Sequence, residues 1–196
     1  MHLTRKLIVA APVLLLALCV GGRSESERPD DASPAAWRQI LKDRLPLYGH
    51  RNWIVIADSA YPAQARPAIE TVDTGASQIE VVRAVLAELD HSRHVRPIVY
   101  TDAELKYVPE ADAPGISAYR EQLAQVLGSR AVTAIPHEQV IADLDKAGET
   151  FKVLILKTKL TVPYTSVFLK LDCAYWSADA EKRLRDAMPK DPLNKE

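Results

Sequence analysis

Two residues in the stretch LYGHRNWIVIADSAYP, residues 47–62, have side chains that could exchange protons with a ligand. His50 precedes a strongly apolar run, and Asp58 ends it. A neutral imidazole exchanges protons near neutral pH, and an ionised carboxylate accepts hydrogen bonds from hydroxyl groups. From residue types alone, each could instead have a purely structural role. His50 could be a loop residue that binds a backbone carbonyl, and Asp58 could form a turn.

The spacing of these two residues limits how they can act. The run WIVIA, residues 53–57, predicts a buried strand because it is apolar, largely β-branched and too short for a helix. At about 3.3 Å per residue, this strand places His50 and Asp58 roughly 20 Å or more apart in one chain. One small ligand therefore cannot contact both within a single chain, whereas a second copy of the chain could bring them together.

Other candidate residues carry weaker signals. His91 and His94 stand three residues apart at a predicted helix end, but no acidic or cysteine cluster completes a metal-ligand set, so we expect no metal site. His137 begins a helix after a strand, and Tyr164 lies in a proline-containing loop. The motifs typical of nucleotide binding, serine hydrolysis and zinc proteolysis are absent from the sequence.

The elements that must position these residues follow from hydrophobic periodicity. Helices are predicted over about 34–45, 77–89, 116–126, 137–148 and 177–188, and we expect the last to pack against the domain. Strands are predicted over 53–57, 95–101, 131–136, 152–158 and 166–171. Their alternation indicates an α/β domain of three layers, α/β/α, with a mostly parallel sheet. No helix separates the last two strands, so the sheet is expected to be mixed.

The N-terminal segment, residues 1–22, has the layout of an export signal. Arg5 and Lys6 precede an apolar stretch that is too short to span a bilayer comfortably. The chain is then divided into a polar linker over 23–33, a single domain over 34–188 and a charged tail over 189–196. We therefore expect an exported protein, either periplasmic or secreted.

The two cysteines leave one alternative open. LALC, residues 16–19, is similar to a lipoprotein box, although Leu18 stands where a small residue is normally required. Membrane attachment is expected only if Cys19 is lipidated. If Cys19 is removed with the signal, Cys173 has no partner for an intramolecular disulfide. We expect Cys173 to be a small buried residue after a strand.

Composition is consistent with one globular domain and excludes one class of partner. Of the 196 residues, 47% are hydrophobic and 26% are charged, which suffices for a proper core. The formal net charge is −1, so the chain has no basic footprint of the kind that binds nucleic acid.

Three segments resemble one known family, the D-ribose pyranases and L-fucose mutarotases (the RbsD/FucU sugar mutarotases). GHRNWIVIADSAYP, residues 49–62, resembles the family signature GH…I…DA..P. HEQV, residues 137–140, is similar to its His-Glu-x-Phe segment, and KTKLTVPYTSVFL, residues 157–169, resembles its RTGE..PYAN.IL segment. The resemblance covers about residues 35–172 and keeps the order and spacing of the three segments.

The resemblance implies an RbsD-like fold and cofactor-free interconversion of the ring forms of a free monosaccharide. It also implies ring-shaped homo-oligomers whose sites lie at subunit boundaries. By match, His50 takes the position of the catalytic histidine, and Asp58, His137 and Tyr164 take sugar-binding positions. Ser166 stands where the family has an asparagine, and its hydroxyl lacks the amide that both donates and accepts hydrogen bonds.

Further departures leave the substrate and the activity open. Lys159 and Leu160 replace the Gly-Glu pair of the family, while Tyr61 resembles the fucose type and Pro163 the ribose type. A mixture of this kind does not assign the sugar. Three functions remain: a monosaccharide mutarotase or pyranase, a non-catalytic carbohydrate-binding protein on the same fold, and a ring-forming scaffold.

Overall fold

The computed structural model describes residues 36–189. The expected signal peptide, the linker, Cys19 and the tail residues 190–196 lie outside the described residues. The chain divides into two units, residues 1–30 and 31–196, and the fold below is that of the second. Within residues 36–189, every helix is too short or too polar to cross a membrane.

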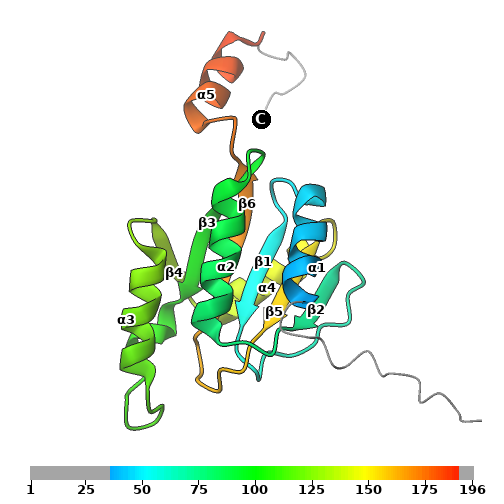
Figure 1. Ribbon diagram of the computed structural model, residues 1–196. Helices are drawn as coiled ribbons and strands as arrows, with labels where there is room; N and C mark the ends of the chain where they lie inside the picture. Colours follow the sequence, from blue (N-terminus) through cyan, green and yellow to red (C-terminus); the bar gives the residue numbers. More distant parts are fainter. Residues whose placement is uncertain (1–35, 190–196) are drawn as a thin grey trace, which may run out of the picture. The chain divides into compact units, whose positions relative to one another are not determined.

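Six strands and five α-helices make up the described part of the chain (Figure 1). The strands are β1 (Trp53–Ala57), β2 (Ile69–Asp73), β3 (Val95–Asp102), β4 (Val132–Ile135), β5 (Val153–Lys157) and β6 (Val167–Cys173). The α-helices are α1 (Ala36–Arg44), α2 (Gln78–His91), α3 (Ile116–Leu127), α4 (His137–Ala147) and α5 (Ala178–Ala187). Two short 3-10 helices, η1 (Leu45–Leu47) and η2 (Ala103–Tyr107), follow α1 and β3.

The strands form one mixed sheet in the order β2-β5-β1-β6-β3-β4. β6 runs antiparallel to both of its neighbours, β1 and β3, and the other three pairs are parallel. The prediction of a mixed, mostly parallel sheet is confirmed. β2 was not predicted, because in the segment IETVD only Ile69 is buried and the strand lies at the sheet edge.

Helices cover both faces of this sheet, which confirms the three layers. α1, α2 and α3 pack on one face and α4 packs on the other (Figure 1). All five residues of β1 are buried, because alternate side chains serve the two cores. Ile54 joins the core beneath α1 to α3, while Val55 joins the core beneath α4 with Leu144 and Phe168.

Two details at the C-terminal end differ from the predictions. The last helix, α5, begins at its N-cap Ser177 but buries none of its residues, so it does not pack against the sheet. Most of its side chains are charged, and Leu184 remains 46% exposed. Cys173 is the last residue of β6 rather than a residue after the strand, and it is half-buried.

The reversed direction of β6 determines which residues meet at the carboxyl ends of the parallel strands. Val167, the first residue of β6, pairs with Ile56 near the end of β1 and with Thr101 near the end of β3. The loop before β6 therefore reaches the edge at which β1 and β3 end. The turn before β1 lies at the opposite edge, where the Arg51 N–H donates to the Leu171 carbonyl at 2.8 Å.

Candidate active site

A cavity of about 450 Å³ opens at the carboxyl edge of the sheet. Its lining comes from residues 58–62 after β1, from residues 161–164 before β6, and from His137 at the start of α4. Asp58, His137 and Tyr164, which come from segments far apart in the sequence, line the same cavity. Convergent polar groups at this edge of an α/β sheet are typical of a ligand site.

Asp58 organises the turn that follows β1 and also faces the loop before β6. Its Oδ1 accepts a hydrogen bond from the Ala60 N–H at 2.9 Å, which is the expected turn. Its Oδ2 accepts from the Ser166 hydroxyl at 3.4 Å. Ser166 is itself 1% exposed and so meets the cavity only through Asp58. The half-buried Asp58 carboxylate retains lone pairs that can accept from ligand hydroxyls.

His137 is held on three sides. Its Nδ1 lies 2.9 Å from Oδ1 of Asp102, and its backbone N–H donates to both carboxylate oxygens of Glu104 at 3.1 Å. The Tyr164 ring meets the imidazole edge to face, with ring centroids 5.5 Å apart. Within residues 36–189, Nε2 of His137 makes no hydrogen bond, so this nitrogen is available to the cavity that the residue lines.

Asp102 is a site residue that sequence reasoning missed. It ends β3, and its side chain has no exposed surface. Burial raises the pKa of the Asp102 carboxyl, while the hydrogen bond and charge of His137 act against that rise. Among the described residues, Oδ2 of Asp102 has no hydrogen-bond partner. The available signal was its position, because Asp102 directly follows a predicted strand, as Asp58 does.

Tyr61 adds a second buried polar group to the cavity wall. The residue is 3% exposed, and its hydroxyl has no partner among the described residues. Burial, reinforced by the negative charges of Asp102 and Asp58, raises the pKa of the Tyr61 hydroxyl. The hydroxyl therefore stays protonated at physiological pH. Sequence reasoning noted the aromatic ring of Tyr61 but not this hydroxyl.

A buried network behind the cavity fixes the loop before β6. The Gln78 side-chain amide donates to the Ile56 carbonyl at 3.1 Å and to the Thr165 carbonyl at 2.8 Å. Tyr119 donates its hydroxyl to the same Thr165 carbonyl at 2.5 Å. Tyr164 adopts the left-handed backbone conformation with φ of 57°, which is uncommon for a tyrosine. The network thus holds a strained residue in the position that places its ring beside His137.

His50 does not join this cavity within one chain. It is exposed in the turn between η1 and β1, at the other end of β1 from Asp58. The structure therefore brings together Asp58, His137, Tyr164 and, through Asp58, Ser166.

The remaining candidate histidines bind the chain itself. His91 contacts the Ala87 carbonyl at 2.6 Å through Nδ1. His94 contacts the Ser92 hydroxyl through Nδ1, and its Nε2 lies 3.1 Å from a backbone carbonyl of the chain. In the part of the chain that the structure describes, no group of three or more His, Cys, Asp or Glu side chains is arranged to hold a metal ion.

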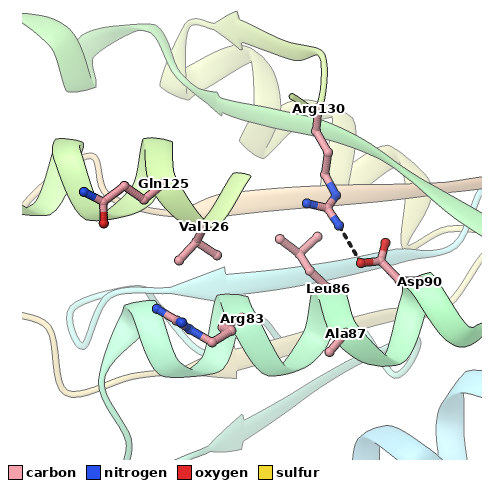
Figure 2. Close-up of a pocket in the computed structure, with 7 residues that line it drawn as sticks. All are labelled: Arg83, Leu86, Ala87, Asp90, Gln125, Val126 and Arg130. Atoms are coloured by element: carbon pink, nitrogen blue, oxygen red, sulfur yellow. Dashed lines mark hydrogen bonds and ion pairs between the residues drawn. The ribbon is translucent and has the colours of Figure 1, made fainter. Parts of the chain in front are cut away.

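A second cavity, of about 340 Å³, lies between α2 and α3 (Figure 2). Its charged lining includes Arg83 and the ion pair between Arg130 and Asp90, whose atoms lie 2.5 Å apart. Figure 2 shows Arg83 and Asp90 on α2, whereas Arg130 lies between the end of α3 and the start of β4. This cavity lacks a histidine and a buried carboxylate, so the carboxyl edge is the better candidate for acid–base chemistry.

The chain is similar to several solved structures. Bacillus subtilis RbsD, solved in complex with D-ribose, is 18% identical, with 68% of this chain and 91% of that chain covered and a TM-score of 0.49. The fucose mutarotase from Streptococcus pneumoniae, solved with L-fucose, is 19% identical, with 75% and 97% covered and a TM-score of 0.44. FucU from Bifidobacterium longum is 17% identical, with 68% and 94% covered and a TM-score of 0.45.

Family assignment rests on a match over most of the chain. None of the curated proteins matches it. The family model described as the RbsD / FucU transport protein family matches residues 37–173, from the first turn of α1 to the end of β6. The chain belongs to the RbsD / FucU family.

Proposed function

We propose that this protein is a monosaccharide mutarotase or pyranase that interconverts ring or anomeric forms of a free sugar by histidine acid–base catalysis. The observation that carries the proposal is the convergence of Asp58, His137 and Tyr164 on one cavity in a chain of this family. Carboxylate, imidazole and phenol groups together bind and activate hydroxyls. A cavity of about 450 Å³ is also large enough for a monosaccharide.

Ring opening of a sugar needs two proton transfers. A base removes the proton of the anomeric hydroxyl, and an acid protonates the ring oxygen as its bond to the anomeric carbon breaks. Closure on the other face of the aldehyde gives the other anomer, and closure through a different hydroxyl changes the ring size. Histidine suits both steps because its ordinary pKa lies close to neutral pH.

We further propose that His50 acts in the cavity of a neighbouring copy, within a ring-shaped homo-oligomer. His50 is exposed at the edge opposite the cavity, so only a second copy can supply it. The edge strand β4 offers a surface for assembly, because residues 132–134 are exposed and Val132 retains 41% of its surface. An exposed apolar edge strand in a monomer is a typical site of association.

Exchange NMR on D-ribose, L-fucose and D-galactose tests the activity. The first two sugars are those present in the solved RbsD and fucose mutarotase structures. Purified protein is expected to accelerate anomer exchange of at least one sugar, and His50→Ala is expected to abolish most of that acceleration. His91→Ala is the matched control, because His91 binds a carbonyl of its own helix. No acceleration of any sugar, or equal acceleration by His50→Ala, would refute the proposal.

A non-catalytic carbohydrate-binding protein is the second candidate function. It is favoured by Ser166, whose hydroxyl reaches only Asp58, and by Leu160, which packs against the core instead of carrying a carboxylate. Calorimetry that shows sugar binding without accelerated exchange would support this candidate. If neither binding nor exchange is found and the protein still forms rings by mass photometry, the scaffold function is favoured.

We propose in addition that the protein is exported, on the basis of residues 1–22. Fractionation of cells that express the full chain, with N-terminal sequencing of the product, is the test. Cleavage near Gly22 with a soluble product supports a signal peptide. A product that stays in the membrane and is released by Cys19→Ser supports lipidation. Uncleaved chain in the cytoplasm would refute export.

A further inference from the structure

The pair formed by His137 and Asp102 goes beyond a sugar-binding role for His137. Asp102 is fully buried at the end of β3, and its Oδ1 lies 2.9 Å from Nδ1 of His137. An ionised carboxylate has no proton to donate, so this contact requires that Nδ1 carry the hydrogen. In the neutral ring Nε2 is then the unprotonated nitrogen. His137 therefore presents a proton acceptor, rather than a donor, to the cavity.

The placement of this pair matches that of a general base and the group that orients it. The His137 side chain is 31% exposed on the cavity side, whereas Asp102 is sealed beneath it. The backbone bond to Glu104 and the edge contact with Tyr164 restrict the ring further. A fully buried carboxylate is unfavourable unless it is paired or hydrogen-bonded. Oδ2 of Asp102 has no partner among the described residues, so the contact of Oδ1 with His137 is the interaction that offsets the burial of the charge.

We infer that His137 and Asp102 form a proton-transfer dyad, in which Asp102 is the positioning residue and Nε2 of His137 exchanges a proton with the sugar. The inference rests on the proposed function and assigns a second acid–base group to the same site. Nε2 accepts the anomeric hydroxyl proton as that oxygen becomes the carbonyl oxygen. The bond between the anomeric carbon and the ring oxygen breaks, and its electron pair stays on the ring oxygen, which takes a proton from the acid.

The acid in this step is His50 of a second copy, under the proposed ring. Asp102 stabilises the imidazolium that forms on His137, since a negative charge lies at hydrogen-bond distance. When the ring closes, Nε2 returns its proton to the carbonyl oxygen and the attacking hydroxyl gives its proton to His50, so both histidines are restored after each turnover. Mutarotation thus uses two histidines, one from each of two copies, and one of them is supported by a buried carboxylate.

The variant Asp102→Asn tests this inference, with Asp143→Asn as the matched control. Asp143 is half-buried on the same helix as His137, and its Oδ1 accepts a hydrogen bond from the Gln139 side chain at 3.0 Å. Asp102→Asn is expected to lower the exchange rate by about 100-fold or more, because general-base catalysis of this kind contributes about 100- to 10,000-fold. Sugar affinity by calorimetry is expected to stay within about threefold. Asp143→Asn is expected to change neither.

Two readouts separate the dyad from a merely structural role. In a His137→Gln background, Asp102→Asn is expected to have no further effect on the rate, because it acts through His137. The pH–rate profile of Asp102→Asn is expected to shift, whereas that of Asp143→Asn is not. The titratable groups that contact His137 or line its cavity are Asp102, Glu104, Tyr164, Asp58 and Tyr61, and His137 also lies at the amino end of α4.

Imidazole ¹⁵N NMR reports directly which ring nitrogen of His137 carries the hydrogen, and it requires no catalytic activity. The neutral His137 ring of the wild type is expected to be the Nδ1–H form, and Asp102→Asn is expected to populate the Nε2–H form. A wild type in the Nε2–H form, or an Asp102→Asn variant with the wild-type exchange rate, would overturn the inference. A wild type that accelerates no sugar would overturn the proposed function and the catalytic role of the dyad, while the NMR experiment still reports the contact.

Discussion

The two ends of strand β1 differ in the kind of side chain that surrounds them. Seven buried residues among those described are polar or charged: Thr74, Gln78, Thr101, Asp102, Thr158, Thr165 and Ser166. All of them lie at or beyond the carboxyl edge. Six lie where a parallel strand ends or just before β6 begins, and Gln78 is the first residue of α2. At the amino edge, His50 is exposed, and the neighbouring turn is held by backbone contacts and by the Asn52 side chain.

This difference shows that the buried polar side chains, which a hydrophobic core does not need, are concentrated at the carboxyl edge. Polar side chains at the carboxyl edge satisfy backbone groups that leave the strands, as Thr158 does for the Ala57 carbonyl at 3.0 Å. Asp102 and Tyr61 differ from Thr158, because each has a buried polar atom without a hydrogen-bond partner among the described residues. Such groups destabilise a fold by about 1–3 kcal/mol each. Trp37 and Gln64 also have such an atom, so it is the position of Asp102 and Tyr61 beside His137 and the cavity that indicates a site.

The largest expected effect is on the exchange rate, when the histidine of either edge is replaced and the two variants are then mixed. His50→Ala and His137→Gln are each expected to lower the exchange rate by about 100-fold or more. If every site combines His50 of one copy with His137 of another, co-assembly of the two inactive variants creates some sites that have both histidines. Mixing them under conditions that exchange subunits is therefore expected to restore a substantial fraction of activity. The rate is measured by exchange NMR and assembly by mass photometry.

Mixing two preparations of the same variant is the control for this experiment. It is expected to restore nothing. A mixture of the two variants that stays inactive despite demonstrated subunit exchange would show that His50 and His137 do not act in one site.

A smaller effect is expected on binding at the carboxyl edge. Asp58→Asn replaces a charged acceptor, and hydrogen bonds to charged groups contribute about 1.5–3 kcal/mol. Sugar affinity by calorimetry is therefore expected to fall about 10- to 100-fold. Ser166→Ala removes only a hydroxyl 3.4 Å from Asp58, so a change of a few-fold is expected. Equal losses in the two variants would mean that the Ser166 hydroxyl contacts the sugar itself.

Much of the sheet and helix framework that separates the two edges could be predicted from the sequence. The apolar run at 53–57 matches β1 residue for residue, and Ser77 is the N-cap of α2 as its pattern indicated. Local signals were sufficient there because burial on both faces and helix capping leave a clear pattern in the chain. Asp58 could be proposed for the same reason, since it directly ends a recognisable strand.

The missed features depend on contacts between distant segments. β2 gains its place by pairing with β5, and the segment IETVD alone has no strong alternation. Asp102 and His137 meet because β3 pairs in parallel with β4, which sets Asp102 opposite Ile135. No pattern within one segment contains that register. The expectation that the last helix packs was wrong, because its charged residues leave no continuous apolar face.

A change at the amino edge is expected to alter stability and not binding. A Cβ added at Gly148 would stand 2.9 Å from Cδ1 and 3.0 Å from Cγ1 of Ile69. Gly148→Ala is therefore expected to lower the free energy of unfolding by about 1–3 kcal/mol through overcrowding. The Tm is expected to fall by about 2–4 °C for each kcal/mol, as measured by thermal melts.

Gly49→Ala is the matched control for this change. A Cβ at Gly49 meets nothing within 4 Å, so the Tm is expected to stay nearly unchanged. Sugar affinity of Gly148→Ala is expected to equal that of the wild type. A large loss of affinity in this variant would show that the two edges are coupled.

The smallest expected effect concerns the stability cost of the buried carboxylate. Burial raises the pKa of Asp102 above its ordinary value of 3.8, so the folded protein binds a proton more tightly than the unfolded chain. Stability that depends on this group is therefore present below pH 3.8 and is lost as pH rises through the folded pKa. Asp102→Asn removes the titration, so its Tm is expected to exceed that of the wild type at pH 8 by a few degrees at most, with the gap closing toward pH 4. A variant less stable than the wild type at pH 8 would mean that the charge pair with His137 stabilises the fold, and that the carboxyl edge is not maintained at the expense of stability.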